Sequence, residues 1–267
     1  MPTYQLTTAF AQQDLSRLYA AGANVVVAKP NAGGRPNVAW IVFRPLISNV
    51  MAWEDKYGIY ASSSQIMNGQ RLVQMAKTEY PAVEGKIYSL TSAGFFGPPS
   101  TGGSPGAYSA VNEYNNLPKG YLTFGLFQDA QVDGVATRGN AVSATPVIFN
   151  SAASVTPFTT VYLWIQSQVM SNTVISNVTS PITEVRFGGA ITEVSLMYDP
   201  TTGTFVPARS QSERRRLAAP PPARAPLTHL AGGTVAASGR SIARPFSGGR
   251  PSAGCSAPQG AARWYRR

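Results

Sequence analysis

The sequence predicts an all-β protein: an antiparallel β-sandwich or jelly roll with one short N-terminal helix and a disordered C-terminal tail. Short apolar runs recur between residues 24 and 198 with Gly, Pro and Asn turn residues between them, which is typical of antiparallel sheets. Only one stretch, near the N-terminus, has helical spacing, and the composition changes abruptly near Pro207. We therefore expect a single β-domain over residues 1–207 and a basic tail over residues 208–267.

The helix is expected first, over residues 9–21. Thr7 or Thr8 is a candidate N-cap, since a hydroxyl there accepts a hydrogen bond from the first helical turn. Gly22 follows where a left-handed C-terminal cap would lie. The apolar side chains that fall broadly on one face are Phe10, Leu15, Leu18 and Tyr19.

Strand-like runs with turn chemistry between them follow the helix. In the first half we expect strands at 24–28, 38–43, 57–62, 71–76 and 86–90. The run at 38–43 is apolar on both faces, as in a central strand. Asn68-Gly69 marks a tight turn. Residues 31–36 precede a strand rather than a helix, so they indicate a hairpin loop instead of a phosphate cradle.

The second half alternates more regularly between apolar and polar residues. Strands are expected at 121–127, 161–165, 183–187 and 192–198. In the first of these, Leu122, Phe124 and Leu126 share one face, which we expect to point into the core. In the third, Glu184 and Arg186 should point outward.

The domain at 1–207 contains neither histidine nor cysteine, and its 11 basic and 11 acidic residues cancel. This removes imidazole bases, thiolate nucleophiles and soft metal ligands from its chemistry. Gly102-Gly103-Ser104-Pro105-Gly106 matches a hydrolase nucleophile motif, but Pro105 lacks the N–H that the oxyanion hole requires. We interpret it as a surface loop. The sequence predicts no cofactor and no metal site.

The tail holds the whole net charge of +10, since it has 11 arginines against Glu213, and it also holds the sole His229 and Cys255. Ala, Arg, Pro, Gly and Ser make up 45 of its 60 residues. The tail therefore has too few apolar side chains for their burial to offset the entropy lost on folding. Its arginines could contact nucleic acid or an anionic membrane. Alternatively, the tail is solvated and has no partner. It could also be an out-of-frame translation product of GC-rich DNA.

The chain shows no secretion signal and no apolar run long enough to span a bilayer. We therefore expect a soluble protein that is cytoplasmic or released without a classical signal peptide.

The densest unusual segment is residues 53–60, which we expect to form a hairpin with charged residues reaching water. Its rings could stack on sugar rings, or they could instead fill the core. A second, weaker polar-aromatic cluster lies near residues 108–116. The candidate ligand-binding residues are Trp53, Asp55, Tyr57, Tyr60, Tyr108, Tyr114 and Asn115.

These observations favour a non-enzymatic, lectin-like module that recognises carbohydrate or a cell surface through loop aromatics. The first alternative is a structural, self-assembling β protein that forms homo-oligomers through exposed edges. The second is a histidine-free glycoside hydrolase built on two carboxylates. Glu54 and Asp55 are adjacent, so on a strand they should point to opposite faces and cannot form that pair.

Overall fold

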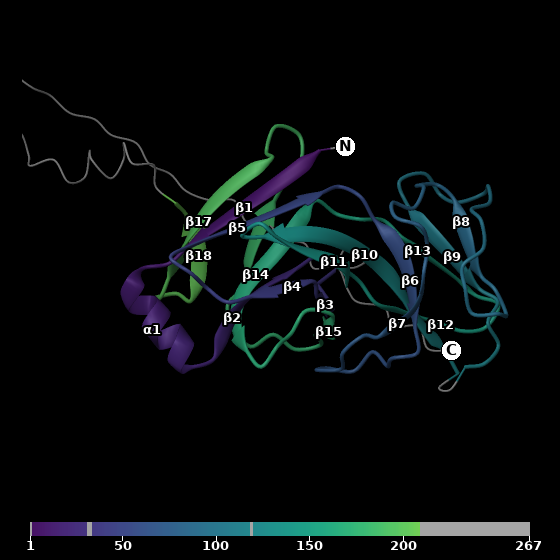
Figure 1. The fold of residues 1–267 in the computed structure, drawn as a ribbon, viewed down its shortest axis with the longest axis horizontal. Helices are drawn as coiled ribbons and strands as arrows, with labels where there is room; N and C mark the ends of the chain where they lie inside the picture. Colours follow the sequence, from purple (N-terminus) through teal and green to yellow (C-terminus); the bar gives the residue numbers. More distant parts are fainter. Residues whose placement is uncertain (1, 31–33, 118–119, 209–267) are drawn as a thin grey trace, which may run out of the picture. The chain divides into compact units, whose positions relative to one another are not determined.

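The structure, a computed structural model, describes residues 2–30, 34–117 and 120–208. In this part the protein is mostly β with one short helix, as the sequence predicts (Figure 1). The chain divides into a first unit, Met1–Ala218, and a second, Ala219–Arg267. The tail predicted over residues 208–267 lies outside the described residues from residue 209 onward. No helix of the described residues is long and apolar enough to cross a bilayer.

The chain begins with a strand where the sequence predicts the approach to a helix. Strand β1 covers Thr3–Ala9 and helix α1 covers Gln12–Ala20. The prediction that Thr7 or Thr8 caps the helix is wrong, because both threonines lie in β1 and Ala11 is the N-cap, without a side-chain hydrogen bond. β-Branched threonine suits a strand as well as a cap. Pairing of β1 on both of its edges decides between the two.

Helix α1 buries the face that its spacing predicts. Phe10, just before the helix, and Leu15 and Leu18 within it are buried, and Tyr19 packs against the same core. The C-terminus is also as predicted, since Gly22 adopts φ +59°, a left-handed conformation that favours glycine.

The largest sheet of the described residues has nine strands. Besides β1 they are β5 (Ser48–Glu54), β6 (Gly58–Ser62), β7 (Gln74–Lys77), β10 (Leu122–Val132), β11 (Val135–Ala141), β12 (Thr145–Val147), β17 (Glu193–Asp199) and β18 (Thr204–Pro207). They follow the order β18-β17-β1-β5-β10-β6-β7, with β11 and β12 also paired to β10. Every ladder in this sheet is antiparallel except that of β1 with β17.

Smaller sheets pack against this one. A four-stranded sheet has the order β16-β14-β2-β4, formed by β2 (Ala23–Ala28), β4 (Ile41–Phe43), β14 (Thr160–Ser167) and β16 (Thr183–Arg186). A three-stranded sheet consists of β8 (Ile87–Leu90), β9 (Tyr108–Asn112) and β13 (Ala152–Val155), with β8 and β9 parallel. β3 (Val38–Ala39) pairs with β15 (Thr173–Val174).

One apolar cluster joins these layers into a sandwich. Met51 of the large sheet packs in the same cluster as Val27 and Leu163 of the four-stranded sheet. The predicted inward face of β10, with Leu122, Phe124 and Leu126 buried, belongs to this cluster, as does Tyr108 of the three-stranded sheet. In Figure 1 the strands β8, β9 and β13 lie at the opposite end of the large sheet from α1.

Most predicted strands are present within a few residues of their expected bounds, but three differ. β10 continues to Val132 rather than ending at residue 127. β7 begins at Gln74 rather than at residue 71. The strand expected over 38–43 is two strands, β3 and β4, separated by the buried Trp40. β4 lies at an edge of its sheet, so the prediction of a central strand is wrong. Packing between layers, rather than pairing on both edges, buries this apolar run.

Strands β5 and β6 lie end to end along one edge of β10. Phe127 pairs with both β11 and β6, and Gln131 pairs with both β11 and β5. Because β11 occupies one edge of β10 at both positions, β5 and β6 must share the other edge. Five residues separate Ala52 from Gly58, whereas three separate their partners Gln131 and Phe127. The β5–β6 side therefore carries two extra residues, and we call residues 53–57 the bulge segment.

The predicted hairpin over residues 53–60 is therefore wrong, since β5 and β6 continue in one direction and do not pair with each other. Gly58, which lies in this segment, allows a close approach between two strands. A Cβ built on Gly58 would lie 2.3 Å from the Phe127 ring. The glycine is needed by a neighbouring strand rather than by a chain reversal.

Candidate functional site

The bulge segment sends alternate side chains into two separate cavities. Trp53, Glu54 and Lys56 line one cavity, while Asp55 and Tyr57 line the other. From Glu54 to Tyr57 this is the alternation of an extended backbone, and Glu54 and Asp55 point in different directions. Gln128 of β10 holds the segment in place, because its Nε2 donates a hydrogen bond of 2.7 Å to the Glu54 carbonyl.

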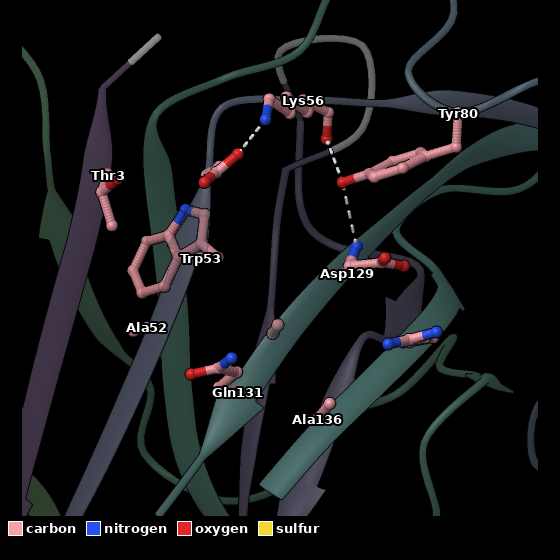
Figure 2. A pocket seen from close by; sticks show the side chains of 11 residues that line it. Thr3, Ala52, Trp53, Lys56, Tyr80, Asp129, Gln131 and Ala136 are labelled. Atoms are coloured by element: carbon pink, nitrogen blue, oxygen red, sulfur yellow. Dashed lines mark hydrogen bonds and ion pairs between the residues drawn. The ribbon is translucent and has the colours of Figure 1, made fainter. Parts of the chain in front are cut away.

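The first cavity, which we call the outer depression, has a volume of about 340 Å³ and lies where β1, β5, β10 and β11 meet (Figure 2). Its lining is mostly polar. The polar and charged side chains in it are those of Thr3, Glu54, Lys56, Tyr80, Asp129, Gln131 and Arg138.

Hydrogen bonds fix part of this lining. Lys56 forms an ion pair with Glu54. The Tyr80 hydroxyl donates to the Lys56 carbonyl at 3.2 Å and accepts from the Asp129 N–H at 3.4 Å, so it joins the bulge segment to β10 (Figure 2). The Asp129 carboxylate accepts a hydrogen bond of 2.6 Å from the Gly139 N–H.

The outer depression contains two acidic and two basic side chains, and the pKa values of Glu54 and Tyr80 in it are shifted. The hydrogen bond and the charge of Lys56 lower the pKa of Glu54, so this carboxyl is an acceptor and not an acid. Burial raises the pKa of Tyr80, which keeps its phenol neutral. Arg138 is exposed and forms no ion pair with any described residue.

The other side of the bulge segment contains a buried lysine. Lys29 follows β2 and is only 1% exposed. Its Nζ lies 4.8 Å from the ring centre of Trp40, 4.9 Å from that of Tyr57 and 5.6 Å from that of Trp53. It donates a hydrogen bond of 2.8 Å to the Tyr57 hydroxyl. In the described part of the chain no carboxylate forms an ion pair with it. We call these four residues the Lys29 cage.

Burial dominates the ionisation of the Lys29 cage. It lowers the pKa of Lys29 to about 7, and the nearby negative charge of Asp55 acts in the opposite direction. Burial, followed by the charge of Asp55, raises the pKa of Tyr57 well above its ordinary value. At neutral pH the lysine is therefore a mixture of amine and ammonium, beside a phenol that keeps its proton.

Two buried polar atoms close to the Lys29 cage have no hydrogen-bond partner among the described residues. They are the Nε1 of Trp53, a donor, and the Oε1 of Gln128, an acceptor. The backbone of Gln128 contacts the cage directly, because its carbonyl accepts a hydrogen bond of 3.2 Å from the Trp40 Nε1. Leaving such atoms unpaired costs about 1–3 kcal/mol each, so each of them requires a structural or functional explanation.

A second cavity, which we call the inner cavity, adjoins the cage and has a volume of about 500 Å³. Tyr57 lines both this cavity and a small space of about 10 Å³ that reaches Lys29. Pro157 also lines both. The ring of Tyr108 lies 5.7 Å from that of Tyr57, on the cavity side.

The structure divides the binding residues that the sequence predicts. The rings of Trp53, Tyr57, Tyr60 and Tyr108 are all buried, so the expectation that they form an exposed stacking surface is wrong. Three of the four lie in strands rather than loops, and alternation directs them into the core. The expected charges do reach water, since Glu54 is exposed and Asp55 and Lys56 are half-buried.

Asp55, Tyr57 and Tyr108 nevertheless come together around the inner cavity, although they belong to two separate clusters in the sequence. Tyr60 faces a different apolar cluster, where its hydroxyl donates to the Ser143 carbonyl at 2.7 Å. Tyr114 packs near Gly94 and lines neither cavity. Asn115 is exposed beside it.

Sequence reasoning did not find Lys29, Tyr80, Gln131 or Arg138. One signal in the sequence could have identified Lys29. It directly follows the apolar run Val25–Ala28 and precedes Pro30, and a lysine that continues a buried apolar strand is unusual. Gln131 and Arg138 become neighbours because β10 is 11 residues long and pairs with β11 beyond residue 127, and Tyr80 joins them through its hydrogen bonds with Lys56 and Asp129.

The remaining motifs contribute no site. Residues 102–106 form a loop between β8 and β9, as predicted. No group of three His, Cys, Asp or Glu in the described ranges is arranged to hold a metal ion.

No family model, no curated protein and no solved structure matches this chain.

Proposed function

We propose that this protein is a non-enzymatic carbohydrate-binding module and that the outer depression binds a neutral sugar. The observation that carries the proposal is the convergence of two carboxylates, Glu54 and Asp129, with Gln131, Arg138 and Tyr80 around one open depression. Its volume of about 340 Å³ lies within the range of small-ligand sites, about 300–1,000 Å³.

The chemistry of this lining suits hydroxyl groups. The Glu54 and Asp129 carboxylates accept hydrogen bonds, and the Arg138 guanidinium and the Gln131 amide donate them. A sugar hydroxyl can do both. Because the two carboxylates are balanced by Lys56 and Arg138, the depression favours a neutral ligand over an acidic or basic one.

The ionisation of Glu54 favours binding over hydrolysis. A glycoside hydrolase needs one carboxyl with a raised pKa to protonate the leaving oxygen. The pKa of Glu54 is instead lowered by Lys56. We therefore assign Glu54 the role of a hydrogen-bond acceptor that orients the sugar.

The test is a glycan array probed with the full chain, followed by titration of each hit. Glu54→Gln and Asp129→Asn should each weaken binding by about 10-fold or more, as expected when a charged hydrogen bond worth 1.5–3 kcal/mol is lost. Glu184→Gln is the matched control, since Glu184 forms an ion pair with Arg186 two residues away, as Glu54 does with Lys56, but lies in β16 of another sheet. The proposal fails if no glycan binds, or if the control weakens binding as much as the two site variants.

Self-association is the second candidate, and exposed apolar side chains at an edge of the large sheet support it. β7 is the last strand in the sheet order. Val73, just before it, and Met75 within it are 66% and 39% exposed, and exposed edge strands can pair with a second copy. Light scattering on the full chain tests this: a dimer that Met75→Lys converts to a monomer supports self-association, and a monomer at all concentrations contradicts it.

A further inference from the structure

We propose that the Lys29 cage and the inner cavity form a carbonyl-binding site, in which the Lys29 amine forms an imine with a small neutral aldehyde or ketone. This proposal does not rest on the proposed function, because the inner cavity and the outer depression share no lining residue; Trp53 alone belongs both to the cage and to the lining of the outer depression.

Lys29 has no carboxylate partner among the described residues. Buried lysines are normally paired with an acid, because an unpaired buried charge is costly. Within the described residues Lys29 has no ion pair, and its ammonium group contacts the Tyr57 hydroxyl at 2.8 Å and three aromatic rings. A desolvated amine in an apolar pocket is the arrangement that turns lysine into a nucleophile.

Two features distinguish this role from a purely structural one. Three aromatic faces would partly stabilise an ammonium that only fills the core. Such a lysine needs neither an adjoining cavity of about 500 Å³ nor an unpaired buried acceptor close by, at Gln128 Oε1. Both features are expected where a polar molecule has to be accommodated.

The ionisation of the surrounding groups agrees with this geometry. A pKa of about 7 for Lys29 leaves about half of it as the neutral amine at pH 7. Tyr57 faces the amine directly, and Asp55 acts on it by its charge. Glu84 and Tyr108 line the more distant part of the inner cavity. The raised pKa of Tyr57 keeps its hydroxyl protonated, so it can donate to a carbonyl oxygen.

The reaction needs no further reactant. The lone pair of the Lys29 nitrogen forms a bond to the carbonyl carbon, and the carbonyl oxygen becomes a hydroxyl by taking up a proton. That hydroxyl then leaves as water with the second nitrogen-bound hydrogen, and a C=N double bond remains. Tyr57 is placed to give a proton to the oxygen and to recover one from the nitrogen.

The inner cavity indicates the class of carbonyl compound. Its walls include the apolar side chains of Pro81, Val83 and Pro157, which suit an aliphatic body. The carboxylates of Asp55 and Glu84 also line it and would repel a 2-oxo acid. The expected ligand is therefore a short uncharged aldehyde or ketone. Lys29 lines only the small space of about 10 Å³, so the carbonyl end has to displace Tyr57 or Pro157, which line both spaces, to reach the amine.

Reductive trapping tests the proposal on the full chain. The protein is treated with butanal and cyanoborohydride at pH 7, and the labelled lysines are identified by peptide mapping. Lys29 should carry at least 10-fold more label than the exposed Lys77. Pyruvate at the same concentration should label Lys29 much less. Tyr57→Phe keeps the ring and should slow trapping at Lys29 without changing that at Lys77. Labelling confined to exposed lysines would overturn the proposal. An intact protein mass one water lower than the sequence predicts would also overturn it, because it would show that the Lys29 amine is already joined to a carboxyl group.

A second measurement uses only the unaltered protein. Between pH 7 and pH 9 the amine fraction of an ordinary lysine rises about 100-fold, whereas that of a group with a pKa of about 7 rises only about twofold. The ratio of label on Lys29 to label on Lys77 should therefore fall by more than 10-fold over this range. A constant ratio would show that Lys29 is trapped no differently from a surface lysine, and would sink the proposal.

Discussion

The bulge segment contributes residues to both the outer depression and the Lys29 cage, yet charged groups on its two sides have opposite environments. On the outer side Glu54 is exposed and is paired with Lys56, which lowers its pKa and keeps it ionised. On the inner side Lys29 has lost its water and has no ion-pair partner in the described structure, so burial lowers its pKa toward neutrality. The two charged groups differ in their access to solvent, since Glu54 is exposed and Lys29 is buried. An exposed charge here can orient a ligand, whereas the buried one becomes reactive.

The largest loss of stability should come from removing the Tyr57 ring, which belongs to the cage and also lines the inner cavity. Tyr57→Ala deletes a fully buried ring and should cost about 3–5 kcal/mol of the free energy of unfolding, measured by urea denaturation. Tyr80→Ala, at the half-buried ring of the outer depression, should cost clearly less. Equal losses for the two variants would show that the two sides are packed alike.

The second expected effect is a pH dependence of the free energy of unfolding that arises from Lys29, on the inner side of the bulge segment. Because the pKa of Lys29 is lowered from 10.5 to about 7 by folding, the unfolded chain binds more protons between these values, and stability should rise with pH. Below pH 7 both states are protonated and the effect vanishes. From pH 7 to pH 9.5 the gain should be about 3 kcal/mol, at about 1.36 kcal/mol per pH unit.

Lys29→Met is the control for this pH dependence, since it keeps the length of the side chain and removes the titrating group. The difference in unfolding free energy between the two proteins should change with pH over pH 7–9.5. The tyrosines of raised pKa, Tyr57 and Tyr108, lose their contribution only as pH rises above about 10. A difference that is constant with pH would mean that Lys29 stays charged in the folded protein.

A third, smaller effect should appear on both sides at once. Gln128→Leu removes the donor that holds the Glu54 carbonyl and should cost about 1 kcal/mol in unfolding free energy. Since this bond sets the bulge segment, the variant should also weaken sugar binding at the outer depression. Unchanged binding together with lowered stability would show that the bulge does not depend on Gln128.

The smallest effect on stability is expected at the outer depression. Glu54→Gln removes an exposed ion pair, and such pairs contribute little to folding. The melting temperature should stay within experimental error of the unaltered protein, while binding of the glycan falls. A clear loss of stability would indicate that Glu54 serves the fold rather than a ligand.

Local patterns predicted the strands better than their partners. Alternation placed Leu122, Phe124 and Leu126 on one buried face, and Gly22 ended the helix as expected. The N-cap at Thr7 or Thr8 was wrong because threonine serves both caps and strands, and only pairing with β5 and β17 selects the strand. The hairpin at residues 53–60 was wrong for a similar reason, since Gly58 is as consistent with a close approach as with a turn.

The sequence by itself determined the fold class and removed histidine and cysteine chemistry from residues 1–207, because composition and residue spacing are local properties of the chain. It also determined that Glu54 and Asp55 face different ways. Only the tertiary structure decided that Lys29 is enclosed by aromatic rings from two separate segments, and that Asp129 of β10 and Arg138 of β11 join Glu54 at one depression. Both sites depend on two residues inserted opposite β10, and that insertion is a matter of register between strands about 70 residues apart.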